Sequence, residues 1–497
     1  MEEKLGLGKR IIEKISSFFD TWYFAACLGL VEILCYYLAL DLVLIIVISL
    51  CISFTFLFKK NLNCVFVQFL FMSSMISVKN SPVNYLSENN STYYFEPSVY
   101  ITCIVFASIP VFIILCRAIQ NFFLKKIRFD ALIISTIFLG LTFITAGLLQ
   151  RNYNSSDVMF GSFMFFFFVI LFIAVQPSVL IEKKTVETVS KQVSFYLVVP
   201  LIEMLVFYID LFIGGNSLNS RQDVFLGWGN RNTLGMLFSV CLPFIAYLIK
   251  NGKDKKFKIF SFCLGALTIV FTIFTFSRQA YLSILVLIFG YLLFKIVHAK
   301  EKEKSKYEFI FAGLIGAIIL IIGICKLVGF LDKFEINNVD ARLMLWQESI
   351  EQFNKNPIFG SGFFYLNGDP NINLESIMPY CCHNTILQMA SSCGFFGLIA
   401  YIAYRSVTIK SILNSLTYYK MYIVASLSVI VLMSLVDIHL FDFFGTAIYV
   451  VLLAMAVYGY RKKDEIELEK NNQERYELWK RNTFIPFLKE FLILFTL

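Results

Sequence analysis

The chain has 497 residues, of which 58% are hydrophobic and 16% are charged, and its mean hydropathy is +0.72. Soluble globular domains of ordinary composition are not this apolar, so the composition excludes a soluble enzyme or a soluble binding module. The net charge of +8 does not indicate nucleic-acid binding, because the Lys and Arg residues stand in short loops between apolar runs. We therefore expect a membrane protein with no nucleic-acid partner.

The apolar runs are roughly 17 to 25 residues long, which is about the length that a helix needs to cross a bilayer. In chain order they lie near residues 22–40, 42–58, 64–78, 98–116, 131–149, 158–181, 193–214, 233–249, 259–276, 280–297, 308–328, 385–404, 421–437 and 440–459. The predicted fold class is all-α: a polytopic integral membrane protein of about fourteen transmembrane helices, with a long external loop that contains amphipathic helices.

Basic residues stand at every second junction between these runs, beginning with Lys59 and Lys60. Short loops rich in Lys and Arg are retained in the cytoplasm, so this alternation predicts that both termini are cytoplasmic. The charged N-terminus lacks the short apolar stretch of a cleavable signal peptide, and we expect the first span to be retained. The predicted location is the cytoplasmic (inner) membrane of a bacterium.

The longest polar segment covers residues 329–384, and loops of that length are usually functional. Its apolar residues recur at spacings of three and four, which predicts an amphipathic helix: Leu343, Trp346, Ile350 and Phe353. Asn338 or Asp340 could cap this helix, and Pro357 with the FGSG turn would end it. We expect the helix to lie along the membrane surface with Trp346 at the level of the headgroups.

Of the three His residues, His383 and His439 are predicted to be outside and His298 inside. His383 ends the long loop immediately before a span, so a rigid element would hold it at the membrane face. A neutral imidazole there can take a proton from a hydroxyl group as a general base. A capping or hydrogen-bonding role is the alternative for His383, and His439, which stands beside Asp437 in VDIHLFD, is the competing base.

Five cations in the predicted external segments are Arg, whereas Lys dominates the cytoplasmic loops: Arg151, Arg221, Arg231, Arg278 and Arg342. The planar guanidinium group gives paired hydrogen bonds to phosphate. Arg278 stands between two apolar runs with almost no loop, so an anionic partner is expected beside it, with headgroup snorkelling as the alternative. Arg231 opens a span in a similar way.

Two acidic residues within a predicted span, Glu203 and Asp210, are further candidates, either as functional groups or as partners of an Arg such as Arg231. The sequence has no phosphate-binding glycine loop and no cluster of metal ligands outside the membrane. We therefore expect neither a metal site nor a cofactor. The adjacent Cys381 and Cys382 are interpreted as packing residues.

Four motifs, in their order along the chain, resemble the O-antigen ligase and polymerase superfamily of bacterial envelope glycan enzymes: GWGNRNTLG, FSRQAY, ARLMLWQESIEQFNKNPIFGSGF and HNTILQMASSCGFFGL. The resemblance covers roughly residues 225–405 and depends most on the long external loop before a late span. Asn356 stands where many members of the family have His, so no catalytic role is carried over to that position.

The resemblance implies a metal-independent, inverting glycosyltransferase that uses a glycan on undecaprenyl diphosphate as its donor. By similarity, His383 would deprotonate the acceptor hydroxyl, and Arg231 and Arg278 would bind the diphosphate. Arg342 and Asn384 would position the substrate. Membrane lipid, a flippase and a chain-length regulator are the expected partners.

The resemblance also suggests a division of the chain into four parts. Residues 1–224 would form the N-terminal transmembrane helices, and residues 225–405 the ligase- or polymerase-like core with the external loop. Residues 406–459 would form the last two transmembrane helices, and residues 460–497 a cytoplasmic tail.

Three alternatives to a polymerase remain at this point. An O-antigen ligase would transfer the glycan to lipid A core, but the Phe-, Ile-, Lys- and Asn-rich composition suggests an AT-rich genome, and a Gram-positive host would have no such core. A flippase for lipid-linked oligosaccharide would be expected to show pseudo-symmetric halves, which the sequence lacks. An envelope acyltransferase would need an early essential His, and this chain has none before His298.

Overall fold

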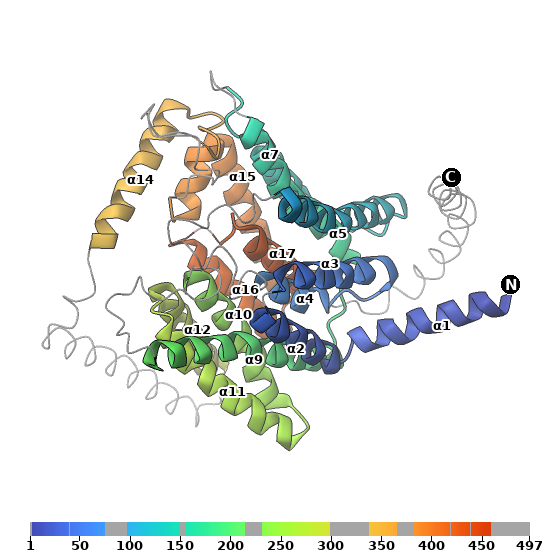
Figure 1. Ribbon diagram of the computed structural model, residues 1–497. Helices are drawn as coiled ribbons and strands as arrows, with labels where there is room; N and C mark the ends of the chain where they lie inside the picture. The colour runs from blue at the N-terminus through green and yellow to red at the C-terminus, as the bar shows by residue number, and fades with distance from the viewer. Residues whose placement is uncertain are drawn as a thin grey trace, which may run out of the picture.

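The computed structural model describes residues 2–38, 40–74, 97–149, 155–213, 231–298, 337–364, 382–417, 419–437 and 439–458. Within these ranges the protein is helical and has no strand, so the predicted all-α fold is confirmed. Figure 1 shows the helices gathered into one bundle, with α1 (Glu2–Phe19) extending sideways from it and α14 (Asn337–Lys355) along its other flank.

The first half of the bundle begins with α2 (Trp22–Leu38), α3 (Asp41–Phe58), α4 (Val65–Ser74), α5 (Pro97–Phe123) and α6 (Ala131–Ile144). It continues through α7 (Ser155–Phe165), a π-helical turn (Phe166–Ile170), α8 (Leu171–Val175) and α9 (Lys183–Ile213). The second half contains α10 (Arg231–Asn251), α11 (Lys255–Phe274), α12 (Arg278–His298), α15 (Thr385–Ser415), α16 (Lys420–Ser434) and α17 (Phe443–Tyr458). Each predicted apolar run coincides with one of these elements, except the run at 308–328, which lies outside the described residues.

Six of the described helices are long and apolar enough to cross a membrane, and there are seven if α1 and α2, which meet at 80°, are one bent span. Five more apolar helices are shorter, including α16 and α17. The protein is therefore a multi-pass membrane protein, whereas the count of about fourteen spans stays a prediction.

The centre of the bundle is formed by helices that are apolar on every side. From Gly445 to Met455 every residue of α17 is buried, and α10 is buried along most of its length. A helix that is apolar all round must be surrounded by other helices or by lipid. Here α10 packs against α9, α11, α12 and α16, and this packing fixes the starts of α10 and α12 beside the end of α16.

Helix α15 is broken at Gly394, whose φ of 67° and ψ of −157° are not helical. The backbone groups freed by the break bond to the FGSG segment that follows α14: the amides of Ser361 and Gly362 donate to the carbonyls of Ser391 and Ser392, at 2.7 and 3.0 Å. In return, the amide of Phe395 donates to the carbonyl of Pro357 at 2.7 Å. Because unpaired backbone groups are costly in a membrane, the segment that follows α14 completes this helix.

The predicted helix in the long loop is present as α14, which ends at Lys355, before Pro357 as expected. It begins at Asn337, so Asn338 and Asp340 lie inside its first turn rather than before it. The predicted cytoplasmic tail at residues 460–497 lies outside the described residues.

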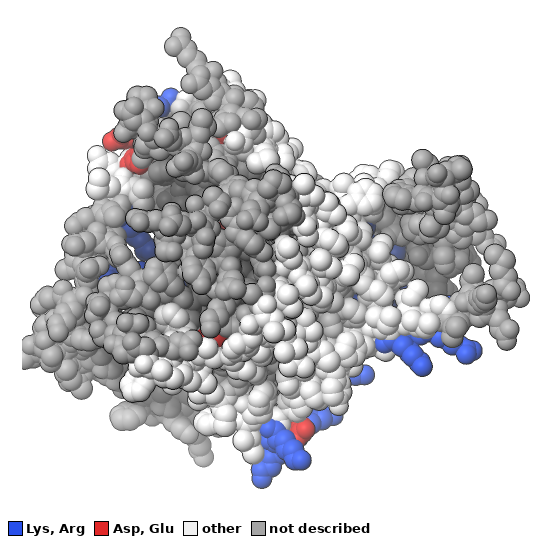
Figure 2. All heavy atoms as spheres, viewed as in Figure 1, with Lys and Arg blue, Asp and Glu red and all other residues white. Residues whose placement is uncertain are grey.

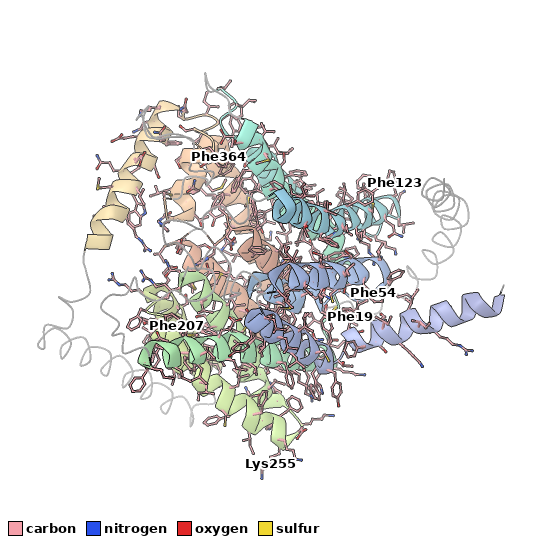
Figure 3. The ribbon with its side chains drawn as sticks, in the orientation of Figure 1. Phe19, Phe54, Phe123, Phe207, Lys255 and Phe364 are labelled. Atoms are coloured by element: carbon pink, nitrogen blue, oxygen red, sulfur yellow. The ribbon has the colours of Figure 1, made fainter. Side chains whose placement is uncertain are left out.

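The charges of the bundle are unevenly distributed. Figure 2 shows Lys and Arg side chains along the lower edge of the view, beneath α1 and at the end of α11 that Figure 3 marks with Lys255. The exposed basic residues there are Lys9, Arg10, Lys14, Lys253, Lys255 and Lys256. Phe364, which follows the FGSG segment, lies at the opposite end, near α7 and α15 (Figure 3).

Candidate active site

Four separate segments of the chain meet at the carboxylate of Asp437, which follows α16. The Nδ1 atom of His383 lies 2.9 Å from Asp437 Oδ1. On the other oxygen, Oδ2, Asn232 Nδ2 donates at 3.0 Å and Gln279 Nε2 donates at 2.9 Å. Asp437 is 4% exposed, so its buried carboxylate depends on hydrogen bonds from neighbouring side chains such as these.

His383 is held in an uncommon backbone conformation, with a φ of 53°. The residue before it is fixed from both sides, because Trp346 Nε1 donates to the Cys382 carbonyl at 3.0 Å and the Cys382 amide donates to Gln388 Oε1 at 3.1 Å. The imidazole remains about one-third exposed, since its side chain is 36% accessible. Because Asp437 accepts a hydrogen bond, Nδ1 carries the proton and Nε2 has a free lone pair.

Asn384 caps α15, because its side-chain oxygen accepts from the amides of Ile386 and Leu387 at 3.0 and 3.1 Å. This contact gives the residue a role in starting the helix that follows His383. Cys382 is buried, and burial raises the pKa of its thiol, in agreement with its interpretation as a packing residue.

Arg231 and Arg278 are the first residues of α10 and α12. Their guanidinium groups are close enough for their positive charges to interact, and both side chains are half-buried. Two helix N-termini and two like charges at one place make a favourable position for an anion with two or more charges. Each arginine is the chain neighbour of one of the two residues, Asn232 and Gln279, whose amides bind Asp437. The arginines therefore lie beside the carboxylate that binds His383.

The ionisation of Asp437 follows from its neighbours. Burial alone would raise the pKa of this carboxyl group, but the hydrogen bond from His383, the charges of His439 and His383 and the bond from Gln279 outweigh burial. The pKa of Asp437 therefore lies below its usual range. The carboxylate is ionised at neutral pH and can stabilise a positively charged imidazole.

Arg342 lies on α14, one helical turn before Trp346, so the two side chains share a face of that helix. Trp346 donates to the carbonyl of the residue that precedes His383, and its expected place at the level of the lipid headgroups stays a prediction. The face of α14 that carries Arg342 is therefore turned towards the start of α15, against which α14 packs.

His439 lies on the buried side of Asp437. It is 3% exposed, and its Nε2 atom, 4.0 Å from Asp437 Oδ2, has no hydrogen-bond partner among the described residues. A base must reach the hydroxyl that it deprotonates, and this position does not allow it. Asp442, three residues after His439, accepts a hydrogen bond from the Gly445 amide at 3.2 Å, at the start of α17.

Of the other charged candidates inside or outside the predicted spans, only Glu203 has a described side chain. Glu203 is buried within α9, which contributes none of the four segments around Asp437. The side chain of Asp210, and all of Arg151 and Arg221, lie outside the described residues. Asn356, at the position where the family resemblance fails, donates to Ser361 Oγ at 2.9 Å and so supports the FGSG turn.

Residues 263–402 match the O-antigen ligase family model. This match confirms the resemblance to the O-antigen ligase and polymerase superfamily for that part of the chain, and it supports a membrane enzyme of the ligase/polymerase type. The ligase match extends from α11 into α15 and includes Arg278, Arg342 and His383. Arg231 and Asp437 lie on either side of it. No curated protein shows a significant match to the chain.

Three residues of this cluster have no role that the sequence predicts: Asn232, Gln279 and Asp437. Asp437 is visible in the sequence only as a neighbour of His439, because a sequence does not show which side chain it binds. Asn232 and Gln279 stand beside the two arginines in the motifs NRN and SRQ. The repeated placement of an amide next to an arginine is the signal that could have identified them.

Proposed function

We propose that the protein is a polysaccharide polymerase, which joins undecaprenyl-diphosphate-linked repeat units at the outer face of the bacterial cytoplasmic membrane. The observation that carries this proposal is the His383–Asp437 pair, built beside the starts of α10 and α12 that bear Arg231 and Arg278. A base next to a place for a diphosphate is what glycosyl transfer from a lipid diphosphate requires.

In the proposed reaction, Nε2 of His383 takes the proton of an acceptor sugar hydroxyl. The hydroxyl oxygen then attacks the anomeric carbon of the donor, and the bond between that carbon and the diphosphate breaks on the opposite side. The configuration at the anomeric carbon is therefore inverted. Asp437 holds Nδ1–H, so that Nε2 faces the acceptor and the resulting imidazolium is stabilised.

The negative charge that leaves with the lipid diphosphate would be stabilised by Arg231 and Arg278. Their positive charges oppose each other and so favour binding of an anion between them, and the two helix N-termini add to this effect. Arg342 would orient the donor or the acceptor from α14, and Asn384 would act through the start of α15. The reaction as proposed needs neither a metal nor a nucleotide.

The choice of a polymerase over a ligase rests on the composition, which suggests a Gram-positive host without lipid A core. The cytoplasmic location of the termini is supported by the basic lower edge of the bundle, because Lys and Arg are retained in the cytoplasm. Membrane lipid, a flippase and a chain-length regulator are the expected partners.

The decisive experiment incubates the purified full chain in lipid nanodiscs with an undecaprenyl-diphosphate oligosaccharide and a chelator, but no nucleotide. Glycans that grow by whole repeat units, with release of undecaprenyl diphosphate, are the expected products. Transfer only when lipid A core is added would identify a ligase. Movement of the donor across the membrane without any new glycosidic bond would identify a flippase and contradict the proposal.

The His383→Ala variant tests the base in the same assay. Loss of a general base typically costs roughly 100- to 10,000-fold in rate, so polymer formation should fall below detection while the variant still binds the donor. His298→Ala, at the end of α12 and on the predicted cytoplasmic side, is the matched control and should polymerise normally. Full activity of His383→Ala would remove His383 from catalysis.

A further inference from the structure

The residues next to the two arginines form a polar network that connects the diphosphate-binding segments to the base. In the motif NRN, Arg231 is followed by Asn232, and in the motif SRQ, Arg278 is preceded by Ser277 and followed by Gln279. The Asn232 and Gln279 amides both donate to Asp437 Oδ2, while the other oxygen binds His383. Each short motif thus carries one side chain for an anion and another for the carboxylate that orients the base.

The orientation of the Asn232 amide is fixed by a further contact. Ser277 Oγ donates to Asn232 Oδ1 at 3.0 Å, which leaves only the Nδ2 group of Asn232 to face the carboxylate. Ser277 is fully buried, and its hydroxyl also accepts from the Ala280 amide at 3.4 Å, at the start of α12. The two arginine motifs are therefore bonded to each other as well as to Asp437.

Gln279 binds both the side chain and the backbone at the end of α16. Its Nε2 donates to Asp437 Oδ2 at 2.9 Å and to the Val436 carbonyl at 3.1 Å. The side chain is 5% exposed, and its Oε1 atom is buried without a hydrogen-bond partner among the described residues. Leaving an acceptor unpaired has a cost, so the orientation of this amide is determined by the two groups that it donates to.

We infer that Asn232 and Gln279 are positioning residues, which hold the Asp437 carboxylate, and through it the His383 imidazole, in register with the two arginines that bind the donor. The inference rests on the proposed function. The two amides do not touch the substrate. They act on the base through Asp437, because they supply the hydrogen bonds that a buried carboxylate needs. The same hydrogen bonds fix the distance of that carboxylate from α10 and α12.

The variants Gln279→Glu and Asn232→Asp test this role with almost no change in shape, because each replaces an N–H donor with a carboxyl oxygen that faces Asp437. Above the pH at which the new carboxyl group loses its proton, the hydrogen bond to Asp437 is lost, which corresponds to a decrease in kcat of roughly 10- to 100-fold. The KM for the lipid-diphosphate oligosaccharide should be unchanged, because Arg231 and Arg278 remain in place.

The dependence of kcat on pH distinguishes positioning from a purely structural role. Two carboxyl groups in contact share a proton at neutral pH and release it at higher pH, so the carboxyl variants should show an additional ionisation in the pH profile. A residue that only supports folding would lower the yield of protein but leave the kcat of each folded molecule and its pH profile unchanged.

A matched control is available at Gln192, which is 1% exposed and donates from Nε2 to the Phe19 and Thr21 carbonyls at 2.8 and 2.9 Å. Gln192→Glu also replaces a buried side-chain amide with a carboxyl group, but it does so away from Asp437. This variant should keep the wild-type kcat and pH profile. Equal losses in Gln192→Glu and Gln279→Glu would overturn the inference.

Two uncharged variants provide the test if the carboxyl variants do not fold. Asn232→Leu keeps the size of the side chain but removes the donor, and Ser277→Ala removes only the group that orients Asn232. Both should lower kcat without raising KM, with the smaller effect in Ser277→Ala. Suppose that wild type polymerises, that His383→Ala does not, and that these variants keep full kcat: the positioning role is then wrong, although the proposed function stands. If wild type itself does not polymerise, the proposed function is wrong.

Discussion

Two residues at the candidate site have backbone conformations that residues other than glycine rarely adopt. His383 has a φ of 53°, and Phe276, two residues before Arg278, has a φ of 52°. A left-handed conformation costs about 1–2 kcal/mol in a residue with a Cβ atom, and it persists only when the surroundings determine it. At His383 the surroundings are the bonds of Cys382 to Trp346 and Gln388.

The role of Asp437 can be tested by Asp437→Asn, which keeps the shape but removes the charge. The expected result is a decrease in kcat of roughly 100- to 10,000-fold, because the imidazole loses both its orientation and its counter-charge. A variant with wild-type kcat would show that the pair is only structural.

The pH dependence of stability has a definite sign at Asp437. Its folded pKa is lowered, so the stabilisation is fully present above the ordinary Asp pKa of about 3.9 and is lost as pH falls through the folded value. Between about pH 5 and pH 8 the wild type should therefore gain no stability from this group on further increase of pH. Thermal unfolding of wild type and Asp437→Asn across that pH range measures the contribution of this carboxylate to stability. A difference in stability between the two proteins that grows steadily from pH 5 to pH 8 would contradict the lowered pKa of Asp437.

Arg278→Lys tests whether the shape of the guanidinium group matters as well as its charge. An ammonium group is a point charge and cannot give paired hydrogen bonds to a diphosphate, so we expect activity to fall roughly 10- to 100-fold. Arg128→Lys, an exposed position between α5 and α6, is the control and should be fully active. Normal activity of Arg278→Lys would favour simple contact with lipid headgroups.

The sequence identified the arginines and His383 because cations and imidazoles at an apolar surface are rare and costly, and so stand out. It did not identify Asp437 as the partner of His383, from which it is separated by 54 positions. His439 is two residues from Asp437 and has the same chemistry as His383, yet it is buried. Only the packing of α16 against α10 and α12 decides which of the two imidazoles is accessible.

At the scale of single elements, the apolar runs predicted the helices well because a chain in lipid must satisfy its backbone within each helix. The break in α15 was not predicted, and residues 385–404 were interpreted as one uninterrupted span. The break depends on bonds to the FGSG segment, which precedes it by some 30 residues, and such a partner leaves no periodic signal. The same segment was predicted correctly as the end of α14.

The variant Gly394→Ala tests this junction. A Cβ atom at position 394 would clash with the Ile358 carbonyl oxygen, and the alanine would have to adopt a positive φ, so we expect at least about 1–2 kcal/mol of destabilisation. The control is Gly290→Ala in α12, where the added atom meets no described atom within 4 Å. It should be neutral or stabilising by up to about 1 kcal/mol. Thermal unfolding in detergent measures both, and equal stability of the two variants would contradict the assignment.

At the scale of the whole molecule, hydropathy predicted a bundle of membrane helices but not how its ends are arranged. The charged N-terminus was interpreted only as a segment before the first span, and it forms α1, which meets α2 at 80°. The angle between two helices is determined by packing and by the membrane surface, and neither is visible in local composition.

The predicted orientation can be tested with single cysteines and a membrane-impermeant maleimide reagent. In intact cells, Met344→Cys on α14, where the side chain is 72% exposed, should react from outside. Lys255→Cys, at the basic end of α11, should react only after the membrane is permeabilised. The unsubstituted chain gives the background from its own cysteines. The reverse labelling pattern would place the candidate active site on the cytoplasmic side.

The bonds between the FGSG segment and the broken α15 have a consequence for engineering this enzyme. An external loop that only joins two spans could be exchanged between relatives to change which sugars are accepted. Here the loop supplies main-chain partners to a helix inside the bundle, so transplanting it alone would leave the carbonyls of Ser391 and Ser392 unpaired. A working chimera must take α14, the FGSG segment and the part of α15 before its break from the same parent protein.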